Sequence, residues 1–246
     1  MTKKISRLRM FAGPNGSGKS TLKSIIRPEL LGIYINPDDI EKEIKKDDFL
    51  DFSYYGVTTS QEEIIEYFIK SPLLEKADLV DAAHELRFND DKLSFRNSGI
   101  NSYFASLVAD FIRNKLIDSS ISFTFETVMS FPDKVKLLEW AQKKGYRTYL
   151  YYVATEDPSI NISRVQYRVK MHGHPVPEDK IISRYERSLN LLMEAVRFSH
   201  RAYIFDNSTH EQILLAEITD GKVLEMKTEQ MPEWFKKALW NPFHIS

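Results

Sequence analysis

The sequence predicts an α/β protein of the three-layer α/β/α type, in which helices cover both faces of a mainly parallel five-stranded sheet. Five short apolar runs lie along the chain, and helical patterns separate most of them. Alternation of strand and helix implies right-handed crossovers, which place helices on both faces of the sheet. The 246 residues, 42% of them hydrophobic, suffice for one such domain with insertions and exclude wholesale disorder.

Each apolar run has the length and composition of a buried strand. The five runs cover residues 8–12, 32–36, 121–126, 146–154 and 202–206. In a sheet of this kind, ligands bind at the carboxyl ends of the strands. The residues directly after each run are therefore the candidates for a functional site.

The remaining segments complete a single predicted domain, residues 1–246. Residues 41–97 are too long for a connecting loop, and their pattern predicts a mostly helical insertion. Residues 101–116 have the spacing of an amphipathic helix. Two arginine-bearing helical patterns occupy residues 157–198 and predict a lid region. The last segment, 211–246, predicts a hairpin followed by a helix.

The composition excludes several classes of protein. A formal net charge of −1 gives no electrostatic reason to expect a nucleic-acid partner. The chain has no cysteine, which excludes disulfides and thiolate metal ligands. It has no uncharged apolar run of about 18 residues, so no membrane span is expected. Residues 1–5 lead straight into the first strand without room for a signal peptide, and we expect a cytoplasmic protein.

A complete phosphate-binding loop follows the first predicted strand and precedes a helical pattern. Its residues are Gly13, Pro14, Asn15, Gly16, Ser17, Gly18, Lys19, Ser20 and Thr21. The glycines let successive backbone N–H groups face phosphate oxygens. Lys19 supplies a positive charge to the β- and γ-phosphates, and the Ser20 hydroxyl is a ligand for Mg²⁺. The loop predicts that the protein binds the phosphates of a nucleotide.

Two carboxylates, Asp38 and Asp39, follow the second apolar run. A small-molecule kinase keeps at this position the base that accepts the proton of the acceptor hydroxyl. Either residue has the right place along the chain for that role. The alternative is that Asp38 or Asp39 simply caps the helix that starts there.

Polar residues also end the third and fifth runs. Glu126 could hold Mg²⁺ through water or bind substrate hydroxyls together with the adjacent Thr127, and the alternative is a partly exposed strand end. Asn207 lies after the fifth run, where phosphate-loop kinases often bind adenine. The same residues, Asp206 to Ser208, could instead form only an Asx turn.

Arginines recur on the two helical patterns that follow the fourth run. Arg164 and Arg168 are four residues apart and share a face, and Arg184 lies on the second helix. Such residues suit a mobile lid that closes over a transferring phosphoryl group, whereas the alternative is a solvated charged face. His172 and His174 lie between the helices, but a third ligand at suitable spacing is missing and we expect no metal there.

Taken together and in order, these motifs resemble the zeta-toxin family of P-loop kinases, and within it the stand-alone bacterial branch often labelled predicted ABC-type ATPases. The resemblance covers roughly residues 5–210 apart from 41–97. The motifs that carry it are Ala12 to Thr21, Asn36-Pro37-Asp38, Phe125-Glu126-Thr127, Gly145-Tyr146, Arg164-Val165, Arg168-Val169, Gly173 to Pro177, Arg184-Tyr185 and Asp206-Asn207-Ser208.

The resemblance implies a P-loop NTPase-like fold and a kinase that uses ATP and Mg²⁺. Well-understood members phosphorylate the 3′-hydroxyl of UDP-N-acetylglucosamine and related nucleotide sugars. By position, Asp38 would be the base, Lys19 the phosphate clamp and Arg164 the lid arginine, with Glu126 in the substrate pocket. The expected partners are ATP and a small-molecule acceptor, and an antitoxin protein is a further candidate.

One departure from the family pattern affects the expected substrate. Family members usually continue Glu-Thr-Thr or Glu-Gly-Thr, whereas this chain has Glu126-Thr127-Val128, which leaves the sugar contacts open. No Leu-Ser-Gly-Gly-Gln-like signature of a transporter ATPase is present. Two other functions remain as alternatives. One is a kinase or repair enzyme acting on nucleic-acid ends, and the other is an ATP-binding regulatory module with little catalysis.

Overall fold

The computed structural model describes residues 5–171 and 173–245, which form two compact units. The first unit contains Met1–Gly32 and Thr124–Ser246, and the second, Ile33–Phe123, is inserted into it in sequence. No helix of the described residues is long and apolar enough to cross a membrane. The predicted entry of residues 1–5 into the first strand involves residues 1–4, which lie outside the described residues.

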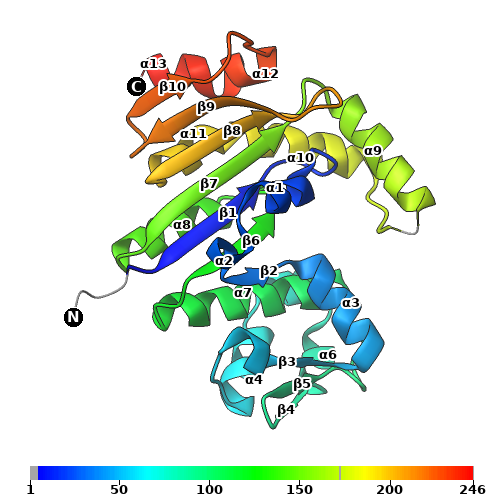
Figure 1. Cartoon of the computed structure of the whole chain (residues 1–246). Coiled ribbons are helices and arrows are strands. Elements are labelled where there is room, and N and C mark those ends of the chain that lie inside the picture. The colour runs from blue at the N-terminus through cyan, green and yellow to red at the C-terminus, as the bar shows by residue number, and fades with distance from the viewer. Residues whose placement is uncertain (1–4, 172, 246) are drawn as a thin grey trace. The chain divides into compact units, whose positions relative to one another are not determined.

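The strands of the first unit lie in one mainly parallel sheet, in the order β10-β9-β8-β7-β1-β6 (Figure 1). They are β1 (Arg7–Ala12), β6 (Phe123–Thr127), β7 (Arg147–Ala154), β8 (Arg201–Asp206), β9 (Ile213–Thr219) and β10 (Val223–Met226). β7 pairs in parallel with β1 and β8, whereas β9 pairs antiparallel with β8 and β10. The parallel strands therefore end at one edge, which collects the segments that follow β1, β7 and β8.

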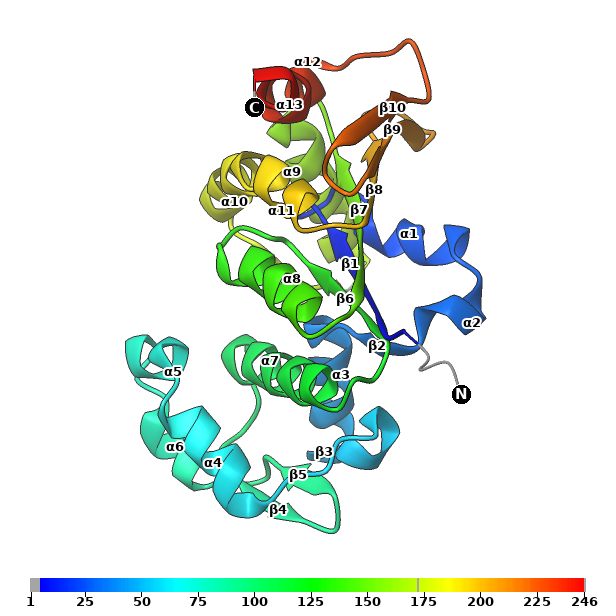
Figure 2. The same ribbon diagram turned by 90° about the vertical axis from the view of Figure 1, so that its left-hand side faces the viewer.

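The helices of the first unit cover both faces of this sheet. They are α1 (Lys19–Ile25), α2 (Pro28–Leu31), α8 (Asp133–Lys143), α9 (Pro158–Lys170), α10 (Glu178–Asn190), α11 (Leu192–Arg197), α12 (Glu233–Phe235), a π-helical turn (Lys236–Trp240) and α13 (Asn241–Ile245). Figure 2 shows α1 on one face of the sheet and α8, α10 and α11 on the other. Neighbouring residues Met10 and Phe11 of β1 are both fully buried, as a strand covered on both faces requires.

The second unit is mostly helical and also contains a small antiparallel sheet in the order β3-β5-β4. Its elements are β2 (Ile33–Ile35), α3 (Pro37–Asp47), β3 (Phe49–Asp51), a 3₁₀ turn (Phe52–Tyr55), α4 (Gln61–Ile69), α5 (Pro72–Lys76), α6 (Val80–His84), β4 (Arg87–Asn89), β5 (Lys92–Ser94) and α7 (Ser102–Asp118). Its core is rich in phenylalanine: Phe68 of α4 stacks on Phe104 of α7, with ring centroids 6.1 Å apart.

The predicted fold class is confirmed. All five predicted strands are present as β1, β2, β6, β7 and β8, and their ends differ from the predicted ends by at most two residues. The predicted hairpin is β9–β10, and it extends the sheet antiparallel to β8. The two strands are joined by residues 220–222. Asp220 and Gly221, with φ angles of 52° and 63°, form the left-handed centre of a turn that the hydrogen bond from the Lys222 N–H to the Thr219 carbonyl closes.

The segment 41–97 differs in detail from the sequence expectation. It is mostly helical, as predicted, with α4 followed by two short helices, α5 and α6, which are separated at Asp78, whose φ is 55°. It also contains β3, β4 and β5, which the pattern did not predict. Each of these strands has three residues, which is too short for a recognisable alternation.

Candidate functional site

The phosphate-binding loop connects β1 to α1 in the first unit, where its glycines adopt conformations that other residues avoid. Gly16 and Gly18 have φ angles of 74° and 97°. Their surroundings are also closed: a Cβ atom on Gly16 would lie 2.6 Å from the carbonyl oxygen of Asn161, and one on Gly18 would lie 2.2 Å from Nδ2 of Asn207. Both the backbone conformation and the packing therefore require glycine at these two positions.

Lys19, the first residue of α1, is folded back over the loop. Its Nζ atom donates hydrogen bonds to the carbonyl oxygens of Gly13 and Pro14, at 2.8 and 2.9 Å. An ammonium group is attracted more strongly to a negatively charged phosphate oxygen than to a neutral carbonyl oxygen, because opposite charges add a Coulomb attraction to the hydrogen bond. A phosphate group in the loop would therefore compete well with these carbonyls for the ammonium group.

Two buried polar atoms of the loop have no hydrogen-bond partner within the part of the chain that the structure describes. They are Oδ1 of Asn15 and Oγ of Ser17, and the Ser17 side chain is fully buried. Leaving a buried polar group unsatisfied costs about 1–3 kcal/mol. Water or a bound ligand is the physical means of satisfying these two atoms, as expected of a site that a polar ligand fills.

The hydroxyl groups after Lys19 differ in their contacts. Ser20 lies in the first turn of α1 and is exposed. The Oγ1 atom of Thr21 donates a hydrogen bond to the carbonyl oxygen of Gly18 at 2.6 Å. Oγ1 of Thr21 also lies 3.1 Å from Oε1 of Gln212. Ser20 thus presents an oxygen ligand of the kind that Mg²⁺ prefers, whereas Thr21 closes the turn at the start of the helix.

Asn207 follows β8 and lies on the phosphate loop. Its Nδ2 donates to the carbonyl oxygen of Ser17 at 2.8 Å. The preceding residue, Asp206, accepts hydrogen bonds from the backbone N–H and hydroxyl of Ser208 at 3.0 and 2.7 Å and from Nε1 of Trp234 at 2.7 Å. The predicted Asx turn is therefore present, and it delivers the Asn207 amide to the loop.

Arg164 of α9 is half-buried and holds the same turn. Its Nη1 and Nη2 atoms donate to the carbonyl oxygens of Asn207 and Thr209 at 2.7 and 3.0 Å. The alternative of a freely solvated arginine does not apply to Arg164, because both terminal nitrogens of its guanidinium are bonded to backbone.

Arg168 and Arg184 have different surroundings. Arg168 is exposed and donates to the carbonyl oxygen of His174 at 2.9 Å, while its own carbonyl accepts from the N–H of Gly173 at 2.9 Å. It therefore braces the connection between α9 and α10. Arg184 lies half-buried on α10. His172, half of the histidine pair considered from the sequence, lies outside the described residues.

Tyr185 ties α10 to the end of β7. Its hydroxyl donates to the carbonyl oxygens of Thr155 and Glu156 at 2.6 and 3.2 Å. Burial, assisted by the nearby charges of Glu156, Asp157 and Asp206, raises the pKa of Tyr185 and keeps the hydroxyl protonated as a donor. Both arginine-bearing helices are thus bonded to the sheet edge that carries the phosphate loop, α9 through Arg164 and α10 through Tyr185.

The structure also contains a site residue that the sequence analysis did not single out. Asn161 of α9 is fully buried, and its Nδ2 donates to the carbonyl oxygen of Asn15 at 2.5 Å. Its Oδ1 accepts from the hydroxyl of Thr155. The sequence feature that could have indicated this residue is its position three residues before Arg164, on the same side of a predicted helix.

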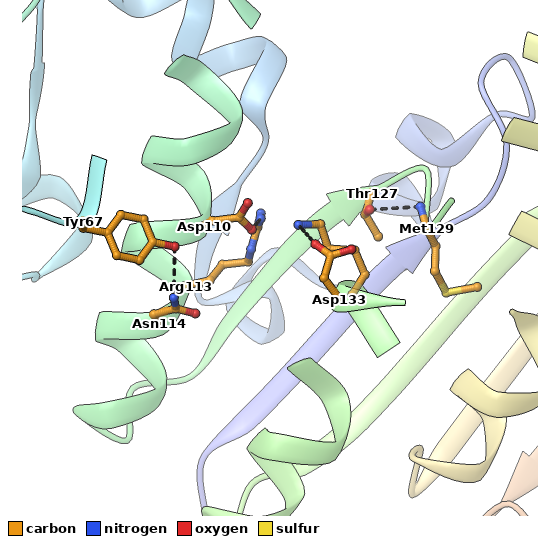
Figure 3. A network of polar contacts seen from close by, with 8 residues as sticks. Tyr67, Asp110, Arg113, Asn114, Thr127, Met129 and Asp133 are labelled. Carbon is orange, nitrogen blue, oxygen red and sulfur yellow. Dashed lines mark hydrogen bonds and ion pairs between the residues drawn. The ribbon is translucent and has the colours of Figure 1, made fainter. Parts of the chain in front are cut away.

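At the end of β6, Glu126 is buried, with 8% of its surface exposed, so it is not an exposed strand end. The next residue, Thr127, accepts through Oγ1 a hydrogen bond from the backbone N–H of Met129 at 3.0 Å (Figure 3). Met129 has a φ of 52° and is fully buried. The Thr127 hydroxyl thus fixes the sharp turn that follows the strand.

Asp38 and Asp39 belong to the second unit, where both are exposed in the first turn of α3. The cap of this helix is Asn36, whose Oδ1 accepts from the backbone N–H of Asp38 at 2.9 Å, and Pro37 occupies the first helical position. The alternative that an aspartate caps the helix is therefore wrong. Both carboxylates remain available for another role.

The second unit has its own polar contacts and a cavity. Figure 3 shows Tyr67 accepting a hydrogen bond from Asn114 at 3.2 Å and the ion pair between Asp110 and the buried Arg113. A cavity of about 440 Å³ is lined by Glu63, Glu66, Tyr67, Lys70, Ser71, Pro72, Leu107 and Phe111. None of the site residues predicted from the sequence lines it.

Among the described residues there is no group of three or more His, Cys, Asp or Glu side chains that could hold a metal ion.

Comparison with known proteins gives one family. The family model described as Zeta toxin matches residues 82–217, a span that includes the arginine-bearing helices and starts after the phosphate loop. A Haemophilus influenzae protein, described as uncharacterized, is 30% identical over 69 residues. That match covers 28% of this chain and 49% of the relative, so the chain spans about half the length of the curated relative it matches.

Solved structures share the fold at low identity. A chain of the crystal structure of AvrRxo1-ORF1:AvrRxo1-ORF2 with sulphate ions matches with a TM-score of 0.52 and 13% identity, over 96% of this chain and 64% of that chain. A chain of the same pair with ATP matches with a TM-score of 0.50 and 12% identity, over 92% and 61%. At these identities the likeness shows a shared fold.

Proposed function

The chain belongs to the zeta toxin family, and we propose that it is a kinase that transfers the γ-phosphoryl group of ATP to a hydroxyl of a small molecule. A nucleotide sugar such as UDP-N-acetylglucosamine is the proposed acceptor. The observation that carries the proposal is the complete phosphate loop, whose backbone is held by residues of the turn after β8 and of an arginine-bearing helix. An ATP-bound neighbour of the same fold supports the choice of nucleotide.

The loop residues have distinct proposed roles in binding. The backbone N–H groups of residues 13–21 would surround the phosphates, and Lys19 would exchange its two carbonyl acceptors for phosphate oxygens. The Ser20 hydroxyl would be a ligand of Mg²⁺. This ion takes few protein ligands and completes its coordination shell with phosphate oxygens and water. When bound, Mg²⁺ neutralises charge that develops on the phosphates.

Asp38 is the proposed general base, which accepts the proton of the acceptor hydroxyl as that oxygen attacks the γ-phosphorus. Its exposed position in the first turn of α3, with capping left to Asn36, supports this role. Asp39, Glu126 and Thr127 are the proposed acceptor-binding residues. Glu126 is the best-supported of them, because a largely buried carboxylate at a strand end is suited to hold sugar hydroxyls.

The arginines are proposed to neutralise charge that spreads over the transferring group. Arg164, Arg168 and Arg184 lie on α9 and α10, two helices that are bonded to the segments after β7 and β8. Arg164 would perform this role by releasing one of its two carbonyl acceptors when nucleotide binds. Because a structural neighbour is one chain of the AvrRxo1-ORF1:-ORF2 complex, we also propose a protein partner of antitoxin type for this chain.

The test is transfer of label from γ-labelled ATP to a panel of nucleotide sugars, free sugars, nucleosides and a 5′-hydroxyl oligonucleotide. We expect label on a nucleotide sugar and loss of roughly 10²-fold or more in the Asp38→Asn protein, with ATP affinity nearly intact. Asp39→Asn should have a smaller effect. Label on the oligonucleotide alone would favour an end kinase, and ATP binding without transfer to any acceptor would favour a regulatory module.

A further inference from the structure

The nitrogen and the oxygen of the Asn161 side-chain amide form hydrogen bonds with two different segments of the first unit. Nδ2 donates to the carbonyl oxygen of Asn15, 2.5 Å away, and Oδ1 accepts from the hydroxyl of Thr155 at the end of β7. The side chain is fully buried, so water does not replace either partner. The Thr155 hydroxyl can donate or accept, whereas the Asn15 carbonyl can only accept. The amide nitrogen of Asn161 must therefore face Asn15, which fixes the orientation of the amide.

This contact fixes the direction of a peptide group in the phosphate loop. In a planar trans peptide, the carbonyl and the following N–H point in opposite directions. By holding the Asn15 carbonyl, Asn161 turns the N–H of Gly16 the opposite way. Asn207 does the same two residues later, because its hold on the Ser17 carbonyl turns the N–H of Gly18 away from Asn207.

The backbone of Asn161 also packs closely against Gly16 of the loop. A Cβ atom on Gly16 would lie 2.6 Å from the Asn161 carbonyl oxygen and 3.1 Å from its Cα. Asn161 thus contacts the loop through side chain and main chain at adjacent residues, 15 and 16. One turn further along α9, Arg164 holds the 207–209 turn that carries Asn207. The start of α9, the loop and this turn therefore brace one another.

We propose that Asn161 is a positioning residue of the phosphate-binding loop, which sets the Asn15–Gly16 peptide so that the Gly16 N–H faces a bound nucleotide phosphate. The inference rests on the proposed function, because it assumes that the loop binds nucleotide. An oriented row of N–H groups attracts an anion most strongly when it is formed before the anion arrives. Asn161 performs this ordering from outside the loop, without touching the phosphate.

The experiment measures affinity for ATP and for ADP in the wild-type, Asn161→Asp and Asn161→Ala proteins. Asp has the shape of Asn and still accepts from Thr155, but it places an oxygen against the Asn15 carbonyl and cannot donate when ionised. Asn114→Asp is the matched control, because Asn114 is a partly buried asparagine of the second unit whose Nδ2 donates to Tyr67. Thermal unfolding without nucleotide is recorded for every protein.

We expect both Asn161 variants to raise the dissociation constants for ATP and ADP roughly tenfold or more at a temperature where each is fully folded, with Asp at least as severe as Ala. Asn114→Asp should bind like the wild type. A purely structural role would lower the unfolding temperature but leave the affinity of the folded variants unchanged, and that result overturns the inference while leaving the function standing. If the wild-type protein binds neither nucleotide, the proposed function itself is wrong, and the inference is wrong with it.

Discussion

The Nη1 atom of Arg164 lies 2.7 Å from the carbonyl oxygen of Asn207, whose own side chain lies 2.8 Å from the carbonyl oxygen of Ser17 in the phosphate loop. A cation on a helix of the proposed lid is thus connected to the nucleotide loop through one residue. The same guanidinium reaches Thr209, so its planar fork spans two carbonyls of one turn. Removing Arg164 should therefore loosen that turn and, under the proposed function, leave the charge on the transferring phosphoryl group less well neutralised.

We expect Arg164→Ala to lower the single-turnover rate of phosphoryl transfer by 10²-fold or more, while ATP affinity falls less than about tenfold, because an arginine that meets transition-state charge contributes mainly to rate. Arg164→Lys should recover little, since a point charge cannot bond to two acceptors as a planar fork does. Arg187→Ala is the matched control: Arg187 lies on α10, bonds to the Ser130 carbonyl and stacks on Phe131.

Arg168→Ala and Arg184→Ala should be next in severity for transfer. Arg168 braces the connection after α9 through the His174 carbonyl, so its loss should also increase proteolytic cleavage between α9 and α10. Measuring transfer and cleavage on the same samples separates the two roles. Unchanged transfer in all three arginine variants would contradict the lid and favour a nucleotide-binding module.

Gly18→Ala should abolish nucleotide binding and destabilise the fold by about 1–3 kcal/mol, because its Cβ would lie 2.2 Å from Nδ2 of Asn207 at a φ of 97°. Gly145→Ala is the control for backbone strain alone, since Gly145 has a φ of 83° but no atom within 4 Å of an added Cβ. Combining Gly18→Ala with Asn207→Ala should recover part of the stability. Urea unfolding of the four proteins checks this, and equal losses at Gly18 and Gly145 would exclude the clash as the cause.

Lys19→Ala should nearly abolish ATP binding, because the β- and γ-phosphates would lose the ammonium group that lies over the loop. Lys23→Ala, one turn later on α1, keeps the same helix and should bind normally. Isothermal titration with ATP at constant ionic strength measures both. Wild-type affinity in Lys19→Ala would make the phosphate-loop assignment wrong.

Glu156 should make the protein less stable as the pH rises. Burial raises the pKa of Glu156, and the charges of Asp206 and Glu233 raise it further. A carboxyl whose pKa is higher in the folded state binds its proton more tightly there, so folding is penalised once the pH exceeds the ordinary glutamate pKa of about 4.3. Glu156→Gln should therefore gain stability over the wild type as the pH is raised from below to above that value. Urea unfolding across that range tests the sign, and a difference independent of pH would contradict it.

The phosphate loop could be predicted because its chemistry is contiguous in sequence: nine neighbouring residues specify the turn, the cation and the helix start. The buried strands were predictable for the same reason, as each is a continuous apolar run. The contact of Asn161 with Asn15 was not, because 146 residues separate the partners, and the position of Asn161 beside Arg164 on a helix does not reveal which backbone group its amide meets. The capping of α3 by Asn36 rather than an aspartate depended on a choice among adjacent polar residues, which only the backbone geometry decides.

Trp234, packed at the carboxyl end of β8 with 4% of its surface exposed, gives the protein a built-in optical probe. Its indole N–H bonds to Asp206, the residue next to the one that contacts the phosphate loop. Indole fluorescence responds to the hydrogen bond and polarity at this nitrogen, so emission from Trp234 should change when the loop fills. Replacing the other two tryptophans, Trp140 and Trp240, by phenylalanine would leave a single emitter. Nucleotide arrival could then be followed in real time on unlabelled protein.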